Sequence, residues 1–130
     1  MKKESGQIES EISQAIIRFE KEFMGRGPVE TRTWIIEDLI LVRLKNVLTP
    51  AEEQLAASGD GEKGRSLVKQ VRQQLLERGR PMLEAIVRDI TGLAVRSLHT
   101  DISTKTGERI IVFTLEKKLF DEPSEKKAKK

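Results

Sequence analysis

Apolar residues recur at helical spacing along the first part of the chain. The stripe consists of Ile8, Ile12, Ile16, Phe19 and Phe23. Charged residues, Glu20 among them, mostly fill the other side, so the pattern predicts an amphipathic helix over residues 7–24. The sequence GRGP at 25–28 predicts its end, because Gly25 suits a left-handed cap and Pro28 cannot continue a helix.

The next stretch changes from helical spacing to residues that favour extended structure. Residues 31–36 are rich in threonine, isoleucine and tryptophan, and residues 39–44 are mostly aliphatic. Glu37 and Asp38 between them predict a tight turn, so the whole stretch predicts a β-hairpin. A short helix follows, in which Thr49 is expected to cap the first turn together with Glu52.

A second long apolar stripe covers residues 65–91 and keeps one helical phase across Gly79 and Pro81. It consists of Leu67, Val71, Leu75, Met82, Ile86 and Ile90, widened by Val68, Leu83 and Val87. Because the phase survives the proline, we expect one long bent helix, and not two separate ones. Residues 94–103 and 109–116 then predict two strands, joined by a turn at 104–107.

The order of elements is a helix and a hairpin, then a short helix, then a long helix and a second hairpin. This pseudo-duplicated helix–strand–strand order predicts an α+β fold, a two-layer sandwich. Two hairpins joined edge to edge would form a four-stranded antiparallel sheet, with the two long helices on one face. We expect a single domain over residues 1–120, a disordered lysine-rich tail at 121–130, and a homodimer that buries apolar groups of the sheet.

Charge and composition exclude several classes of protein. The formal net charge is +3, but residues 125–130 alone carry four lysines and one glutamate, which leaves residues 1–124 neutral. Nucleic-acid binding therefore has little support, since such proteins concentrate basic charge on a folded face. The longest apolar run, LILV, is far shorter than the roughly twenty residues of a spanning helix. With no cysteine and no secretory signal, we expect a cytoplasmic protein.

The stretch LHTDISTKTGER at 98–109 holds the one histidine of the chain. Alternation along a strand places His99 and Asp101 on one face, and the turn brings Arg109 close to them. This predicts one polar cluster, which would be either a site for a small anion or a proton, or the wet side of a sheet. Arg26 is a further candidate for an anion contact. No cofactor or metal motif accompanies these residues, so neither is expected.

Three stretches, EISQAIIRFEKEFMGRGP, LTPAEEQLA and LHTDISTKTGERIIVF, resemble in order and spacing a small bacterial family, the MpsC-like family. That family is described as a component of a sodium-translocating membrane-potential-generating system and is otherwise a domain of unknown function. The resemblance covers about residues 5–118, with Pro81 as a departure where an ordinary helical residue is expected. It implies a cytoplasmic accessory protein, at most peripheral to the inner membrane face, and it offers no catalytic residues to carry over.

The leading hypothesis is therefore a non-catalytic accessory or regulatory protein of a system that moves ions or inorganic carbon across a membrane. It would act by contact with a membrane-protein complex or by sensing a small anion. Alternatives are a small enzyme that uses His99 and Asp101 as an acid–base pair, and a nucleic-acid-binding module. The candidate binding residues are Arg26, His99, Thr100, Asp101, Glu108 and Arg109.

Overall fold

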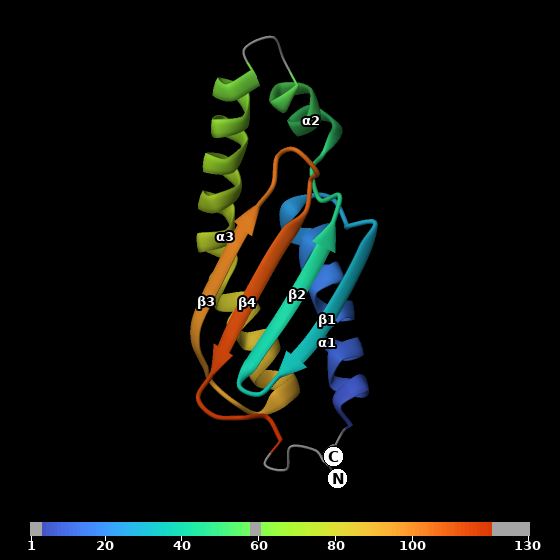
Figure 1. Cartoon of the computed structure of the whole chain (residues 1–130), viewed down its shortest axis with the longest axis vertical. Coiled ribbons are helices and arrows are strands. Elements are labelled where there is room, and N and C mark those ends of the chain that lie inside the picture. Colours follow the sequence, from blue (N-terminus) through green and yellow to red (C-terminus); the bar gives the residue numbers. More distant parts are fainter. Residues whose placement is uncertain (1–3, 58–60, 121–130) are drawn as a thin grey trace.

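The computed structural model describes residues 4–57 and 61–120, and it confirms the α+β sandwich (Figure 1). The first half holds α1 (Ser5–Phe19), the π-helix η1 (Glu20–Met24), β1 (Glu30–Ile36) and β2 (Leu39–Lys45). The second half holds α2 (Pro50–Ala56), α3 (Gly61–Thr91), β3 (Val95–Ile102) and β4 (Arg109–Leu115). The expected tail at 121–130 lies outside the described residues.

The four strands form one antiparallel sheet in the order β1-β2-β4-β3. Each hairpin therefore supplies one edge strand and one central strand. The hairpins join edge to edge, as predicted from the sequence, and the structure shows that the joining strands are β2 and β4. Glu37 forms the first turn with a φ of 57°. The register aligns Trp34, Leu41, Val112 and His99 in one row across the whole sheet.

One face of the sheet carries the core, and α1 and α3 cover it (Figure 1). Alternation along β2 and β4 turns every second side chain toward the helices. These buried strand residues are Ile40, Val42, Leu44, Ile111, Phe113 and Leu115. The predicted stripe of α1 packs against them through Ile8, Ile12, Ile16 and Phe19. Packing of this large apolar surface is the main stabilising contribution to the fold.

The long helix α3 is continuous through Pro81, but its buried side differs from the prediction. Leu67, Val71 and Met82 are about half exposed, at 47%, 46% and 45%. The inward line lies one residue later and consists of Val68, Arg72, Leu76, Gly79, Leu83 and Val87. The pattern of apolar residues did not identify this inward line, because an arginine and a glycine occupy two of its positions.

The first helix also departs from the prediction at its carboxyl end. Residues 20–24 form a π-helix and not α-helix, and Gly25 then closes it with a φ of 93°. Glu20, which we placed on the polar side, is fully buried, and Met24 is buried one turn later. Phe23 is only partly buried, and its ring stacks on Phe19 at a centroid distance of 5.2 Å.

Among residues 4–57 and 61–120, no helix combines the length and the apolar character that crossing a bilayer requires. The longest helix, α3, has charged and amide side chains along much of its length.

Candidate functional site

The three stretches that carry the family resemblance meet at one end of the sheet. The first stretch reaches the second where Arg26 Nη1 donates a 2.7 Å hydrogen bond to the carbonyl of Leu48. Immediately before the second stretch, the Val47 amide donates a 2.8 Å bond to the carbonyl of Gly107 in the third. Segments far apart in the sequence are therefore joined by hydrogen bonds to backbone carbonyls, next to a group of buried charges.

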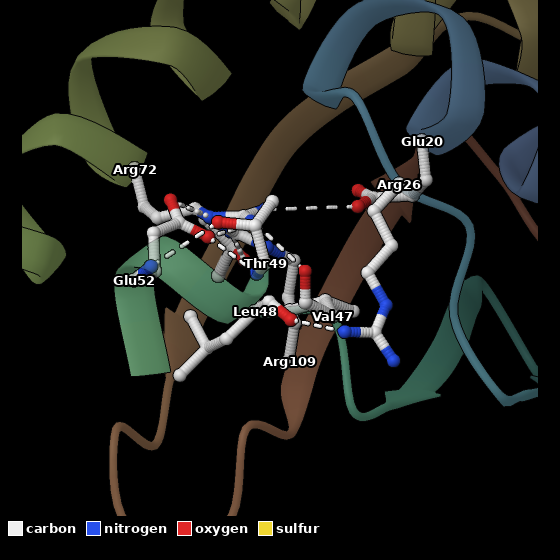
Figure 2. A network of polar contacts seen from close by, with 9 residues as sticks. Glu20, Arg26, Val47, Leu48, Thr49, Glu52, Arg72 and Arg109 are labelled. Atoms are coloured by element: carbon white, nitrogen blue, oxygen red, sulfur yellow. Dashed lines mark hydrogen bonds and ion pairs between the residues drawn. The ribbon is translucent and has the colours of Figure 1, made fainter. Parts of the chain in front are cut away.

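These charges form what we call the polar core cluster: Glu20 of η1, Glu52 of α2, Arg72 of α3 and Arg109 of β4 (Figure 2). Glu20, Arg72 and Arg109 are at most 2% exposed. Ionised groups are rarely buried to this degree unless they are paired. The cluster contains two carboxylates and two guanidiniums, so its formal charges balance.

Arg72 is the best-satisfied member of the cluster. Its Nε and Nη2 donate to the two carboxylate oxygens of Glu52 at 2.9 and 2.6 Å, and Nη2 also donates to the Val47 carbonyl at 2.7 Å. This is the two-pronged guanidinium–carboxylate arrangement, the strongest kind of charged hydrogen bond. Arg72 thereby fixes α2 and the segment that follows β2 against α3.

Glu52 joins this ion pair to a helix cap. Its Oε1 accepts from the Thr49 amide at 2.8 Å, and the Thr49 hydroxyl accepts from the Glu52 amide at 3.2 Å. This confirms the capping box predicted from the sequence. Burial opposes ionisation of Glu52, but the hydrogen bonds and charge of Arg72 and the bonds to Thr49 outweigh it, so the pKa of this carboxyl is lowered.

Arg109 enters the core from the first position of β4. Its Nη1 donates to Thr100 Oγ1 at 2.8 Å, and that hydroxyl donates to the Ile110 carbonyl at 2.8 Å. Within the described part of the chain, its Nε and Nη2 have no hydrogen-bond partner. Burial lowers the pKa of Arg109, while the nearby Glu20 carboxylate acts in the opposite direction.

Glu20 is the least-satisfied member. Its nearest ion-pair contact is Arg72 Nη1, 3.8 Å from Oε1, and neither carboxylate oxygen accepts a hydrogen bond from any described residue. Burial raises the pKa of Glu20, although the charges of Arg109 and Arg72 act against this rise. The cluster therefore contains an acid that gains a proton more easily than an exposed glutamate, beside guanidinium donors that lack acceptors.

The predicted cluster of His99, Asp101 and Arg109 on one face is wrong for Arg109. Arg109 pairs with Ile102 and points with it toward the helices, whereas His99 is exposed on the opposite face. The prediction ignored the alternation of β4, in which Arg109 has the same parity as the buried Ile111. Thr100, also a candidate, does meet Arg109.

The other sequence candidates lie outside the core and make surface contacts. His99 has the Ser97 hydroxyl 3.2 Å from its Nε2, and Asp101 Oδ1 lies 3.2 Å from Lys69 Nζ of α3. A bond from the Ile102 amide, together with Lys69, lowers the pKa of Asp101. Glu108 forms an ion pair with Arg43 on the neighbouring strand.

The face of the sheet away from the helices forms a second surface of interest, which we call the open sheet face. Its apolar residues are Trp34, Ile36, Leu39, Leu41, Ile110 and Val112. All are half-buried except Ile36, which is 50% exposed. At the edges lie Arg32, which packs over the Trp34 ring at 5.3 Å, and His99.

Sequence reasoning missed Glu20 and Arg72, although a signal for both exists. Glu20 follows Ile8, Ile12 and Ile16 at steps of four, and Arg72 lies midway between Val68 and Leu76 at the same step. A charged residue at the centre of an apolar helical stripe indicates burial with a partner.

The comparisons with known proteins agree with the resemblance inferred from the motifs. Residues 4–117 match the family described as "Na+-translocating membrane potential-generating system (MpsC)". An uncharacterized protein of Bacillus subtilis (strain 168), YbcI, is 48% identical over 115 residues, which are 88% of this chain and 90% of that protein. No solved structure matches the chain. The chain therefore belongs to the MpsC family.

Proposed function

We propose that the protein is a non-catalytic accessory component of an ion-translocating membrane system, located at the cytoplasmic side, and that it acts as a homodimer through protein contact. The family description supports the membrane system. The observation that carries the contact role is the open sheet face, where apolar side chains form a continuous surface on two central strands. Contiguous apolar surface of this kind marks interaction sites.

A second copy of the chain is the occupant that fits this face best. The row Trp34–Leu41–Val112–His99 runs across the sheet in strand order. A two-fold axis parallel to the strands, between β2 and β4, would place Leu41 of one copy on Val112 of the other. The apolar centres would then cover each other in a face-to-face sheet packing, about 10 Å apart.

The edges of the face are complementary under the same axis. Arg32 on β1 would lie over the β3 strand of the second copy, in the row that contains Asp101. Opposite charges at the rim help to orient the two copies relative to each other more than they strengthen their association. The apolar centre and the opposed edge charges together favour a symmetric dimer over contact with an unrelated flat surface.

The assembly is tested by placing a charge at the centre of the face. Val112→Glu should convert a dimer into a monomer in light scattering at micromolar concentration, because each new carboxylate would be buried against Leu41 of the second copy, with its like-charged counterpart close by across the axis. This weakens association by about 100-fold or more, since such juxtaposition costs several kcal/mol. Gln74→Glu, on the exposed side of α3, is the matched control and should stay dimeric.

Thermal unfolding of Val112→Glu checks that the change acts on assembly and not on folding, and Leu41→Gln serves as a milder second variant. A wild-type protein that is monomeric at micromolar concentration contradicts the dimer. So does a Val112→Glu protein that folds and remains dimeric.

The accessory role is tested in cells that lack the chromosomal copy of the gene. The membrane potential, measured with a potential-sensitive dye at varied external sodium, should be restored by the wild type and by Gln74→Glu, but not by Val112→Glu. If a folded, monomeric Val112→Glu protein fully restores the membrane potential, the contact role is contradicted. Loss of restoration in a His99→Gln protein that folds and remains dimeric would favour the acid–base enzyme instead.

A further inference from the structure

The two buried arginines of the polar core cluster use the same edge of the guanidinium differently. Arg72 presents Nε and Nη2 to the two oxygens of Glu52. The corresponding Nε and Nη2 of Arg109 donate no hydrogen bond to any described residue, although the side chain is almost wholly buried. That edge matches two oxygens of a planar oxyanion in geometry and charge.

Two further groups with unmet hydrogen-bonding capacity belong to the same cluster. Arg72 Nη1 has no described acceptor, and Glu20 accepts no hydrogen bond at either oxygen. Glu20 forms an ion pair at 3.8 Å with Arg72 and none with Arg109 in the described part of the chain (Figure 2). Buried polar atoms nearly always have a hydrogen-bond partner. Three guanidinium nitrogens without an acceptor, beside a carboxyl group without a donor, therefore call for an explanation.

We propose that Glu20, Arg72 and Arg109 form a buried site for a small monovalent oxyanion, such as formate or nitrate, which binds together with a proton on Glu20. Arg109 donates from Nε and Nη2, Arg72 donates from Nη1, and protonated Glu20 donates from its hydroxyl. Four donors then surround an ion that only accepts. Complete burial restricts the ion to a small size.

The proton is required by the charge balance of the cluster. Its two carboxylates and two guanidiniums already sum to zero, so an added anion would leave an uncompensated negative charge in the core, which is unfavourable. A proton on Glu20 removes that charge and converts an acceptor into a donor. The groups that face Glu20 are Arg109, Arg72 and Glu52, and burial, the largest influence, already raises the pKa of this carboxyl.

The backbone at Glu20 supports a role beyond packing. Glu20 is the first residue of η1, and π-helical turns are rare and occur frequently at functional sites. The cluster also lies where the three family stretches converge. Its residues are distinct from the open sheet face, so the anion site and the proposed dimer are tested independently.

The test is the melting temperature of the full chain at constant ionic strength, with gluconate, a bulky carboxylate, replaced stepwise by nitrate or formate. Binding to the folded state should raise the melting temperature in a saturable way. Because one proton binds with the anion, the apparent Kd should weaken about tenfold for each pH unit above the pKa of Glu20.

Two variants make the test specific, and both conserve size. Glu20→Gln mimics the protonated acid and should bind the anion with an affinity that no longer depends on pH. Arg109→Lys keeps the charge but loses the paired donors, and should weaken binding at least tenfold. Gln74→Glu, on the exposed side of α3, should behave as the wild type.

Equal shifts with gluconate and nitrate, or shifts that persist in Arg109→Lys, indicate a general salt effect and overturn the proposal. A Glu20→Gln protein that melts lower and gains nothing from nitrate or formate also overturns it. That outcome means that the Glu20 carboxylate is itself the partner of Arg109, directly or through water.

Discussion

Gly79 lies in the middle of α3, a position where glycine weakens a helix by about 1 kcal/mol relative to alanine. Its backbone faces the aromatic pair of the first helix. A Cβ added there would lie 2.6 Å from Phe19 Cζ and 3.1 Å from Phe23 Cε2. The close approach of the two helices therefore explains the glycine, and Gly79→Ala is the change that tests it.

Two opposing terms set the expected magnitude. Alanine in place of glycine stabilises the helix by about 1 kcal/mol. Against this, the Phe19 ring must retreat from 2.6 Å to beyond the 3.4 Å of ordinary contact, while it is buried and stacked on Phe23. Overpacking of this kind costs about 1–3 kcal/mol. We expect Gly79→Ala to lower the free energy of unfolding by about 1 kcal/mol.

Urea unfolding followed by circular dichroism measures the change. The midpoint should fall with the slope unchanged, which shows a change in stability and not in the compactness of either state. The melting temperature should fall by about 4 °C for a domain of this size.

Phe19→Leu provides the matched background, because it removes the outer ring atoms that a Cβ would meet. In that background Gly79→Ala should stabilise by up to about 1 kcal/mol, so the two changes couple strongly in a double-mutant cycle. If Gly79→Ala stabilises the wild type by the full helix-propensity term, the ring moves freely and the explanation fails.

Four further outcomes follow from the site and the faces of the sheet. The pKa of Glu20 is raised in the folded protein. Its contribution to stability is therefore complete below the ordinary pKa of 4.5 and is lost as pH rises through the folded pKa. Glu20→Gln should remove this decline from urea midpoints measured between pH 4 and 8. The pKa of Glu52 is lowered, so its contribution is lost as pH falls through the folded value, and Glu52→Gln should flatten stability below pH 4.5. Thr49→Ala removes one half of the capping box and should lower the free energy of unfolding by about 1 kcal/mol in the same assay. His99→Gln, at an exposed position, should change the free energy of unfolding by no more than about 0.5 kcal/mol.

The architecture was predictable because its signals are repetitive and local. Steps of three and four marked α1 and α3, alternation marked the strands, and Gly25 marked the end of the first helical segment. The capping box at Thr49 needed only two residues at fixed spacing. Each of these features follows from backbone geometry and neighbours in sequence, so a single chain is enough to find them.

The candidate site was not predictable in the same way, because its members come from four elements and break the hydropathy rule. Glu20 was placed on the polar side of its helix and Arg72 was not singled out, since charge normally faces water. Arg109 was placed beside His99 by nearness in the hairpin, although the parity of β4 puts it on the other side. The conversion of residues 20–24 to a π-helix depends on packing and has no comparable local signal.

The pairing of β2 with β4 has a consequence for synthesis of the chain. Leu39–Lys45 is made early, yet the strand that completes its hydrogen bonding, Arg109–Leu115, is the last of the described strands to leave the ribosome. Until then the aliphatic edge of β2 is an unpaired template that other nascent chains can join. Translation speed across the 60 or so residues between these strands, and chaperone access during that interval, therefore bear directly on the yield of folded protein.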